Sequence, residues 1–234
     1  MKIVPMTKDF ILYRCIHVGP LGPENIDKLT EKDRQSTRDM FIRNKKFFSL
    51  LVETYGSCAM LAIENDLVIA HARFYPQIIS ELTGKNDMCC QQLKYAPTAD
   101  MIEMDLPTFE ELTDPSLRIY CWHVHKDYRN QGISHALLKG IFQWAIANGW
   151  KTILASAGVD DPWVTSQSCA PMLRTYLKHG FEITSTVPSP ELLDYLKKVR
   201  DGEYGIEEKE KLKKSFAGKN LSQAAVYYKV KKDL

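Results

Sequence analysis

The segment around Gly132 combines residue types that could hold an anion. Val124 closes a β-rich run, a basic turn at residues 126–130 follows, and a helical pattern begins near Gln131. The first amides of a helix lack partners inside the helix, and the helix dipole is positive at that end. Gly132 and the small Ser134 would let a ligand approach these amides closely. The junction therefore predicts a site for phosphate or pyrophosphate, and an ordinary strand-to-helix turn is the alternative.

Two motifs in this part of the chain point to one protein family. The segment has neither the GxxxxGK[ST] spacing of a Walker loop nor the GxGxxG fingerprint of dinucleotide-binding folds. It resembles instead the acetyl-CoA signature [QR]-x-x-G-x-[GA] of the GNAT superfamily of N-acetyltransferases, here Arg129-Asn130-Gln131-Gly132-Ile133-Ser134. Further along, residues 176–181 resemble the Tyr-x-x-x-Gly-Phe end of the family's later helix. The resemblance covers about residues 117–187.

The resemblance implies a cofactor, a reaction and a set of site residues. Acetyl-CoA would be the co-substrate, lying between two splayed central strands, and an amine would attack its thioester directly. The main chain of Val124 would hold the pantetheine arm. Backbone amides of the turn would hold the pyrophosphate: those of Arg129, Asn130, Gln131, Gly132, Ile133, Ser134 and His135. Tyr176 would protonate the departing thiolate as the general acid, or would simply pack beside Phe181.

The sequence departs from the family pattern at three positions. Ser134 stands where glycine or alanine is usual, Lys126 where proline is common, and Cys169 where asparagine often begins the later helix motif. Ser134 is small enough for the turn. The other two changes have no evident effect on binding of the cofactor, although Cys169 could alter how the pantetheine arm or the helix start is held.

The general base is not evident from the sequence. Many GNAT relatives place an acidic or histidine side chain four or six residues before the motif valine, where this chain has Tyr120 and Arg118. His123 and His125 alternate with the motif valine and are expected on the opposite face of the strand. They also form a His-x-His pair, but no third ligand has a recognisable spacing, so no metal is expected. The remaining candidates are a chain of water molecules or the side chains of His71, Glu53 and Glu103.

Hydrophobic periodicity and turn residues predict the elements that would position this site. Residues 131–148 carry apolar side chains at i, i+4, i+8 and i+11, the pattern of one buried helix face. Residues 57–63 and 67–75 flank a turn and predict a hairpin. The other expected strands are residues 10–18, 117–125, 152–157, 181–187 and 224–231. Helices are also expected at residues 168–179 and 191–214, and residues 23–48 predict one or two further helices.

This order of elements, with the GNAT resemblance, predicts an α/β (α+β) fold. We expect a mixed, mostly antiparallel central sheet flanked by helices, in one domain over residues 1–234. Residues 76–116 contain four prolines and show no long period, which predicts an insertion or lid before the motif strand. Residues 188–222 predict a charged helical appendage before the last strand.

The composition excludes several classes of protein. Of the 234 residues, 44% are hydrophobic and 26% charged, which is typical of a folded, soluble protein rather than a disordered or fibrous one. The net charge of +2 excludes a general nucleic-acid or acidic-membrane binder, and no apolar run could span a membrane. We expect a cytoplasmic location. The six cysteines form no CxxC pair and are expected to be reduced and mostly buried, although the adjacent Cys89 and Cys90 could be reactive or bind a metal.

Two classes of function follow. The first is an acetyl-CoA-dependent N-acetyltransferase that acts on a primary amine by direct attack in a ternary complex. Its acceptor would be a small molecule, a peptide or a protein N-terminus. The alternative is a CoA-binding regulatory or scaffold protein without catalysis, because the motif strand lacks an evident base. The sequence fixes neither the acceptor nor the oligomeric state, for which a homodimer is one option.

Overall fold

The structure, a computed structural model, describes residues 1–28, 35–84, 96–166, 170–216 and 220–234. The chain forms two compact units, residues 1–153 with Leu234, and residues 154–233. Within the described ranges, no helix is long and apolar enough to cross a membrane. The adjacent Cys89 and Cys90, and Cys169, lie outside these ranges, whereas Cys15, Cys58 and Cys121 are buried thiols, as predicted.

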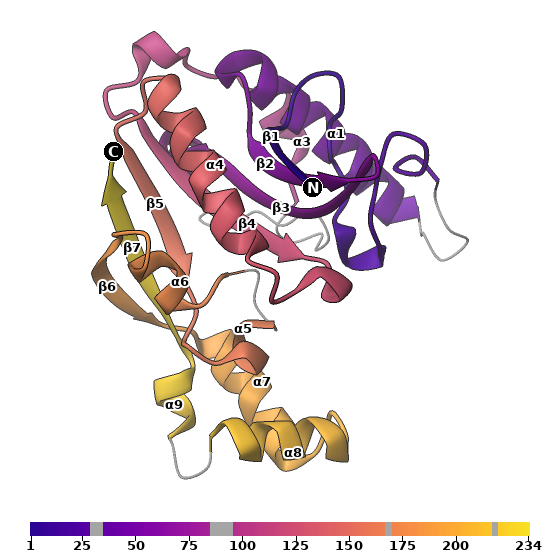
Figure 1. The fold of residues 1–234 in the computed structure, drawn as a ribbon, viewed down its shortest axis with the longest axis vertical. Helices are drawn as coiled ribbons and strands as arrows, with labels where there is room; N and C mark the ends of the chain where they lie inside the picture. Colours follow the sequence, from indigo (N-terminus) through magenta and orange to yellow (C-terminus); the bar gives the residue numbers. More distant parts are fainter. Residues whose placement is uncertain (29–34, 85–95, 167–169, 217–219) are drawn as a thin grey trace. The chain divides into compact units, whose positions relative to one another are not determined.

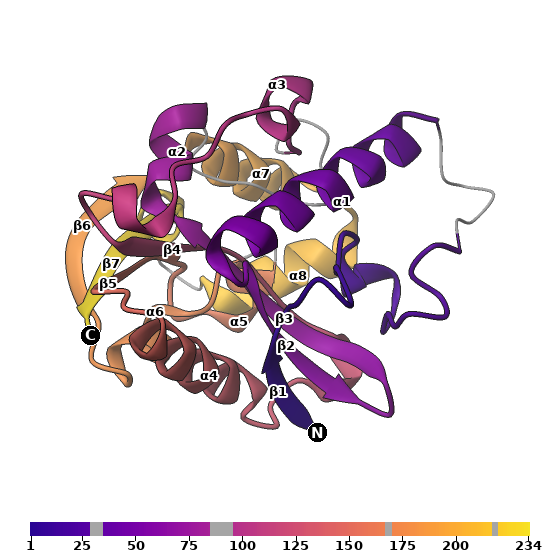
Figure 2. The same ribbon diagram turned by 90° about the horizontal axis from the view of Figure 1, so that it is seen from above.

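Four strands of the first unit pair antiparallel in the order in which the chain makes them. They are β1 (Lys2–Pro5), β2 (Ala59–Glu64), β3 (Leu67–Pro76) and β4 (Ser116–Val124). The predicted hairpin is β2 and β3, and the predicted motif strand is β4. Two helices, α1 (Gln35–Tyr55) and α4 (Ile133–Ala147), lie on opposite faces of this sheet (Figure 2). The face that α1 covers is called the α1 face below.

The helix α4 packs closely on the sheet, and a glycine makes this possible. Leu137 and Ile141 are fully buried on the face that the sequence predicted. A Cβ atom at Gly140 would lie 2.7 Å from a methyl carbon of Ile3 and 3.1 Å from the side chain of Met60. Glycine weakens a helix interior, but here it lets the helix backbone approach β1 and β2. The N-terminus of α4 is thereby fixed relative to the end of β4.

The connection between β3 and β4 is long although the two strands are hydrogen-bonded neighbours. It contains the helices α2 (Gln77–Thr83) and α3 (Ala99–Ile102) and the 3-10 helix η3 (Phe109–Glu111). The described parts of this connection, residues 77–84 and 96–115, lie outside the strands, as expected for an insertion. Their role as a lid stays a prediction.

Residues 10–18 do not form the strand that their β-rich sequence predicts. The segment is irregular and ends in the 3-10 helix η1 (Ile16–Val18), while β1 lies earlier in the chain. The 3-10 helix lies against β3 and β4. Of the predicted helical region at residues 23–48, residues 23–27 are turns, residues 29–34 lie outside the described ranges, and α1 runs from Gln35 to Tyr55.

Side chains from β3 and α1 satisfy the main chain of this irregular segment. Arg73 is fully buried, and its Nη2 donates to the carbonyls of Leu12 and Arg14 at 2.5 and 3.1 Å. The amide of Asn44 donates to the carbonyl of Tyr13 at 3.1 Å. Buried carbonyls need such donors when no neighbouring strand supplies them. The segment therefore stays a loop because side-chain donors replace a β-ladder.

A bulge in β4 changes which side chains share a face of the sheet. Arg73 pairs with Cys121 and the next residue of β3 pairs with Ile119, so Tyr120 is the extra residue. Its ring stacks on Tyr75 at 4.6 Å, and the Cys121 sulfur lies 3.6 Å from Nε2 of His71. A bulge places two successive side chains on one face. The α1 face therefore carries both Tyr120 and Cys121.

The second unit continues the strand pattern of the first. It contains most of β5 (Thr152–Ala157), then β6 (Glu182–Pro188) and β7 (Val226–Asp233), in the spatial order β5-β7-β6 with β6 and β7 antiparallel. Its helices are α5 (Pro162–Ser166), α6 (Leu173–Leu177), α7 (Pro190–Asp201), α8 (Ile206–Ser215) and α9 (Leu221–Ala224). The described residues form seven mostly antiparallel strands with flanking helices, which confirms the predicted fold class.

The charged region before the last strand is two helices rather than the single predicted one. Gly202 adopts a φ of 93° at the end of α7, which stops that helix before α8 begins. The two helices pack side by side (Figure 1) and share a small core with α5 and α9. The predicted helix at residues 168–179 is shorter as well. Its described part is α6, and residues 167–169 lie outside the described ranges.

Removing the Arg73 guanidinium should destabilise the first unit. Arg73→Met keeps an apolar stem but leaves two buried carbonyls without these donors, so the free energy of unfolding should fall by about 2–4 kcal/mol. Arg118→Met is the matched control, because Arg118 is half-buried and its Nε donates to the side chain of Gln77 at 2.6 Å. Urea unfolding followed by tryptophan fluorescence measures both. Equal losses in the two variants would contradict a special role for Arg73.

Candidate functional site

The loop between β4 and α4 has a backbone shape that exposes its amides. The 3-10 helix η4 (Lys126–Tyr128) leads to Asn130 with a φ of 63° and then to Gly132 with a φ of 76°. Positive φ at a residue other than glycine is uncommon and is tolerated best by asparagine and aspartate. Asn130, Gln131 and Gly132 are all exposed. The loop therefore holds two left-handed residues at the surface, next to the start of a helix.

The start of α4 has no side chain that caps it. Gly132 is the N-cap residue, and no acidic residue lies in the first turn. The first helical bond runs from the amide of Ala136 to the carbonyl of Gly132 at 3.1 Å, so the amides of Ile133 and Ser134 precede the helical ladder. A Cβ built on Gly132 finds no atom within 4 Å. This geometry suits an anion such as a pyrophosphate, because donors and open space coincide at the positive end of a helix dipole.

The main chain of Val124 is the other part of the predicted site. The amide of His125 donates to the carbonyl of Ile69 in β3 at 2.9 Å. In an antiparallel pair the main-chain groups of successive residues point to alternate sides. The amide and carbonyl of Val124 therefore point away from β3. Its carbonyl accepts from Nε of Arg129 at 3.2 Å, so this side chain and a pantetheine arm would share one acceptor.

The hydroxyl of Ser134 has a structural role that the sequence did not predict. Its oxygen accepts from the indole nitrogen of Trp122 at 3.3 Å. This bond ties the first turn of α4 to β4, two residues before the strand ends. Serine is therefore accommodated where the family usually has glycine or alanine, and His135 beside it is half-buried.

The predicted general acid, Tyr176, lies in the second unit. It lies in α6 and is fully buried, with its ring edge-to-face on Phe181 at 4.9 Å. Its hydroxyl has no hydrogen-bond partner among the described residues. Burial raises the pKa of this hydroxyl far above its ordinary value, so it stays protonated. The ring does pack beside Phe181, and the acid role stays a prediction.

The candidate bases named from the sequence occupy different environments. Glu53 and Glu103 are exposed, on α1 and at the end of α3. His71 is fully buried beside the Cys121 sulfur. The rings of His71 and His123 lie 6.4 Å apart on the α1 face. Because of the bulge, Tyr120 lies on the same face. The expectation that His123 and Tyr120 lie on opposite faces is therefore wrong, because strict alternation ignores the bulge.

Sequence reasoning missed one group of side chains. Cys15, His17 and His123 lie together, although the first two come from the irregular segment and the third from β4. The only local signal was the Cys-x-His spacing of the first pair, which is too common to predict a site.

The strand, the left-handed turn and the uncapped helix are features that suit an anion at a helix start. The sequence profile of the acetyltransferase (GNAT) family matches residues 25–181. The chain therefore belongs to the GNAT acetyltransferase family.

Solved structures similar to this chain include acetyltransferases. An IAA acetyltransferase from Bacillus cereus ATCC 14579 is 14% identical with a TM-score of 0.44, covering 100% of this chain and 99% of that one. A GNAT acetyltransferase from Elizabethkingia anophelis with acetyl-CoA bound is 18% identical with a TM-score of 0.40, covering 79% and 82%. A phosphinothricin acetyltransferase from Sinorhizobium meliloti in complex with acetyl-CoA is 14% identical with a TM-score of 0.43, covering 84% and 69%. No curated protein matches the chain.

A charge placed at Gly132 should separate anion binding from local strain. Gly132→Glu and Gly132→Gln impose the same strain at a φ of 76°, and both side chains enter open space. Only glutamate adds a negative charge beside the expected pyrophosphate, so CoA should bind the Glu variant at least about tenfold more weakly than the Gln variant. Isothermal titration with CoA, on variants with matching circular dichroism, measures the difference. Equal affinities would show that no anion binds at this turn.

Proposed function

We propose that this protein transfers an acetyl group from acetyl-CoA to a primary amine. The observation that supports this most is the exposed, uncapped start of α4 behind Gly132, in a chain that belongs to the GNAT acetyltransferase family. The amides of the turn, Arg129, Asn130, Gln131, Gly132, Ile133, Ser134 and His135, are the donors proposed for the pyrophosphate. The main chain of Val124, which points away from β3, is proposed for the pantetheine arm.

Direct transfer in a ternary complex needs little from the protein beyond positioning. Holding an amine and a thioester together supplies much of the rate by proximity. The amine's lone pair forms the new bond to the carbonyl carbon, the nitrogen loses a proton to a water molecule, and the bond to the CoA sulfur breaks. The turn anchors one reactant through the main chain, so its grip does not depend on the titration of a side chain.

Tyr176 is proposed to donate its hydroxyl proton to the departing thiolate. A buried phenol without a hydrogen-bond partner is costly, and a thiolate acceptor would satisfy it. Because burial raises the pKa of Tyr176, the hydroxyl carries its proton over the whole neutral range. It is therefore always in the form that an acid requires.

The acceptor is proposed to be a small molecule, a peptide or a protein N-terminus that carries a primary amine, and the location to be cytoplasmic. Thiol release from acetyl-CoA in the presence of a pooled amine library tests the reaction. Thermal stabilisation by CoA, measured in parallel, tests binding alone. Stabilisation without thiol release for any amine would favour a CoA-binding regulatory or scaffold protein.

Tyr176→Phe should lower turnover without weakening the fold. The substitution removes only the hydroxyl, so turnover should fall by roughly 10²–10⁴ if the hydroxyl is the acid. The melting temperature should stay equal or rise, because the lost hydroxyl has no partner among the described residues. CoA affinity should not change. Turnover within a factor of two of the natural enzyme would make Tyr176 a packing residue only.

A further inference from the structure

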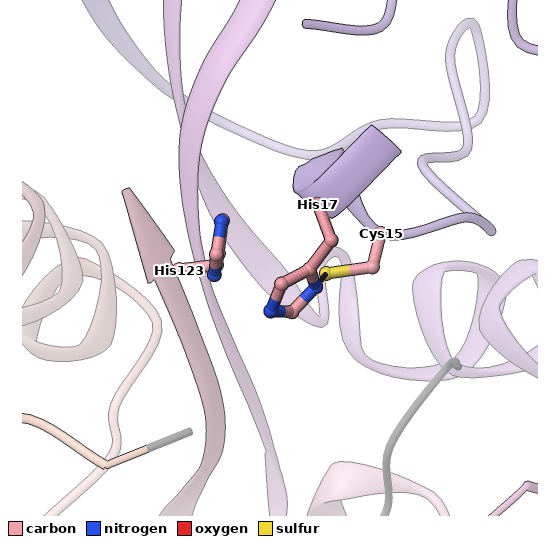
Figure 3. A group of neighbouring side chains, drawn as sticks. All are labelled: Cys15, His17 and His123. Carbon is pink, nitrogen blue, oxygen red and sulfur yellow. Dashed lines mark hydrogen bonds between the residues drawn. The ribbon is translucent and has the colours of Figure 1, made fainter. Parts of the chain in front are cut away.

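Three side chains with metal-binding atoms converge at the α1 face (Figure 3). The sulfur of Cys15 lies 2.7 Å from Nδ1 of His17, and the ring centroids of His17 and His123 are 3.7 Å apart. One ligand atom from each residue lies within 4.8 Å of the other two. Cys15 is buried, His123 half-buried and His17 exposed, so the group reaches from the interior to the surface.

Hydrogen bonds of Arg73, packing of η1 and pairing of β4 hold this group in place. Arg73 fixes the carbonyls of Leu12 and Arg14, and Cys15 follows directly. The 3-10 helix η1, which contains His17, lies against β3 and β4. His123 pairs with His71 across the sheet, three residues after the bulged Tyr120. Cys15 and His123 are thus positioned by the buried Arg73 and by the sheet, and His17 is the exposed member of the group.

We propose that Cys15, His17 and His123 bind a zinc ion. A thiolate and two imidazoles are a donor set that zinc prefers, whereas magnesium and calcium take oxygen ligands. Typical Zn–S and Zn–N bonds place ligand atoms about 3.3–3.6 Å apart, so the atoms must move by about 1 Å from their present spacing. Rotation of His17 supplies this movement. Three protein ligands leave a fourth position open on the ion.

Binding has a definite proton balance. Zinc takes the sulfur of Cys15 as a thiolate, so the thiol proton is released to solvent as the Zn–S bond forms. The two imidazoles bind in their neutral form through one ring nitrogen each. No oxidant or reductant takes part. The site is separate in its chemistry from acetyl transfer and goes beyond the proposed function.

Metal binding to the whole, metal-free protein tests the proposal. Cobalt(II) is the probe, because a thiolate on cobalt gives a charge-transfer band and a tetrahedral site gives strong visible bands. Zinc affinity is then measured by competition with a chromophoric chelator. We expect the natural protein to show both bands, and Cys15→Ala to lose the charge-transfer band. His17→Gln and His123→Gln should each weaken zinc binding by roughly 100-fold. Loss of a residue that only hydrogen-bonds to a metal ligand already weakens binding by about 10–100-fold, and loss of a ligand should cost at least as much.

Two control variants keep the test specific. Cys58→Ala removes a buried thiol outside the group, whose pKa burial raises, and His179→Gln removes a histidine of the second unit. Both should bind cobalt and zinc as the natural protein does. Circular dichroism of every variant separates loss of a ligand from loss of fold. A natural protein without the thiolate band, or unchanged zinc affinity in His123→Gln, would overturn the proposal and leave a hydrogen-bonded thiol–imidazole pair.

Discussion

The buried guanidinium of Arg73 is the interaction on which the N-terminal part of the fold depends. A fully buried cation must find acceptors, and an irregular buried segment must find donors for its carbonyls. Arg73 and residues 10–15 meet both needs at once, with Leu12 and Arg14 as acceptors and the ring of Phe48 4.8 Å from the guanidinium carbon. The sheet therefore carries a loop, rather than another strand, on its α1 face.

The second constraint is the bulge at Tyr120, which acts on the same face. Without it, Tyr120 and His123 would lie on opposite sides of β4. With it, the α1 face gains an aromatic stack on Tyr75 and keeps His123 within reach of η1. The hydrogen bonds of Arg73 and the bulge at Tyr120 together determine which polar groups of the N-terminal segment lie near those of β4. Neither Arg73 nor Tyr120 takes part in the chemistry proposed for the turn at Gly132, so the two regions can vary separately.

Local patterns predicted the elements whose causes are local. The apolar spacing of α4, the turn between β2 and β3, and Gly132 at the helix start all act within a few residues, and the structure has them where expected. Residues 10–18 were predicted wrongly because their β propensity is real, while the donor that replaces a ladder is more than fifty residues away. Gly202 itself indicated that the helix ends there, but the continuous charged pattern on both sides favoured a single helix. The grouping of Cys15 with His123 depends on the fold of the whole first unit and has no local signature.

The difference between local and long-range causes also explains why the turn could be recognised despite its departures from the family pattern. An anion site built from main-chain amides depends on φ values and on open space, so its side chains can change. Ser134 shows this directly, because its hydroxyl is used by Trp122 and takes nothing from the amides. A side-chain function such as that proposed for Tyr176 has no such tolerance, since the hydroxyl itself is the reagent. The main-chain turn is therefore the part of the candidate site that sequence predicts best, and a proposed side-chain role such as that of Tyr176 is the part it predicts least.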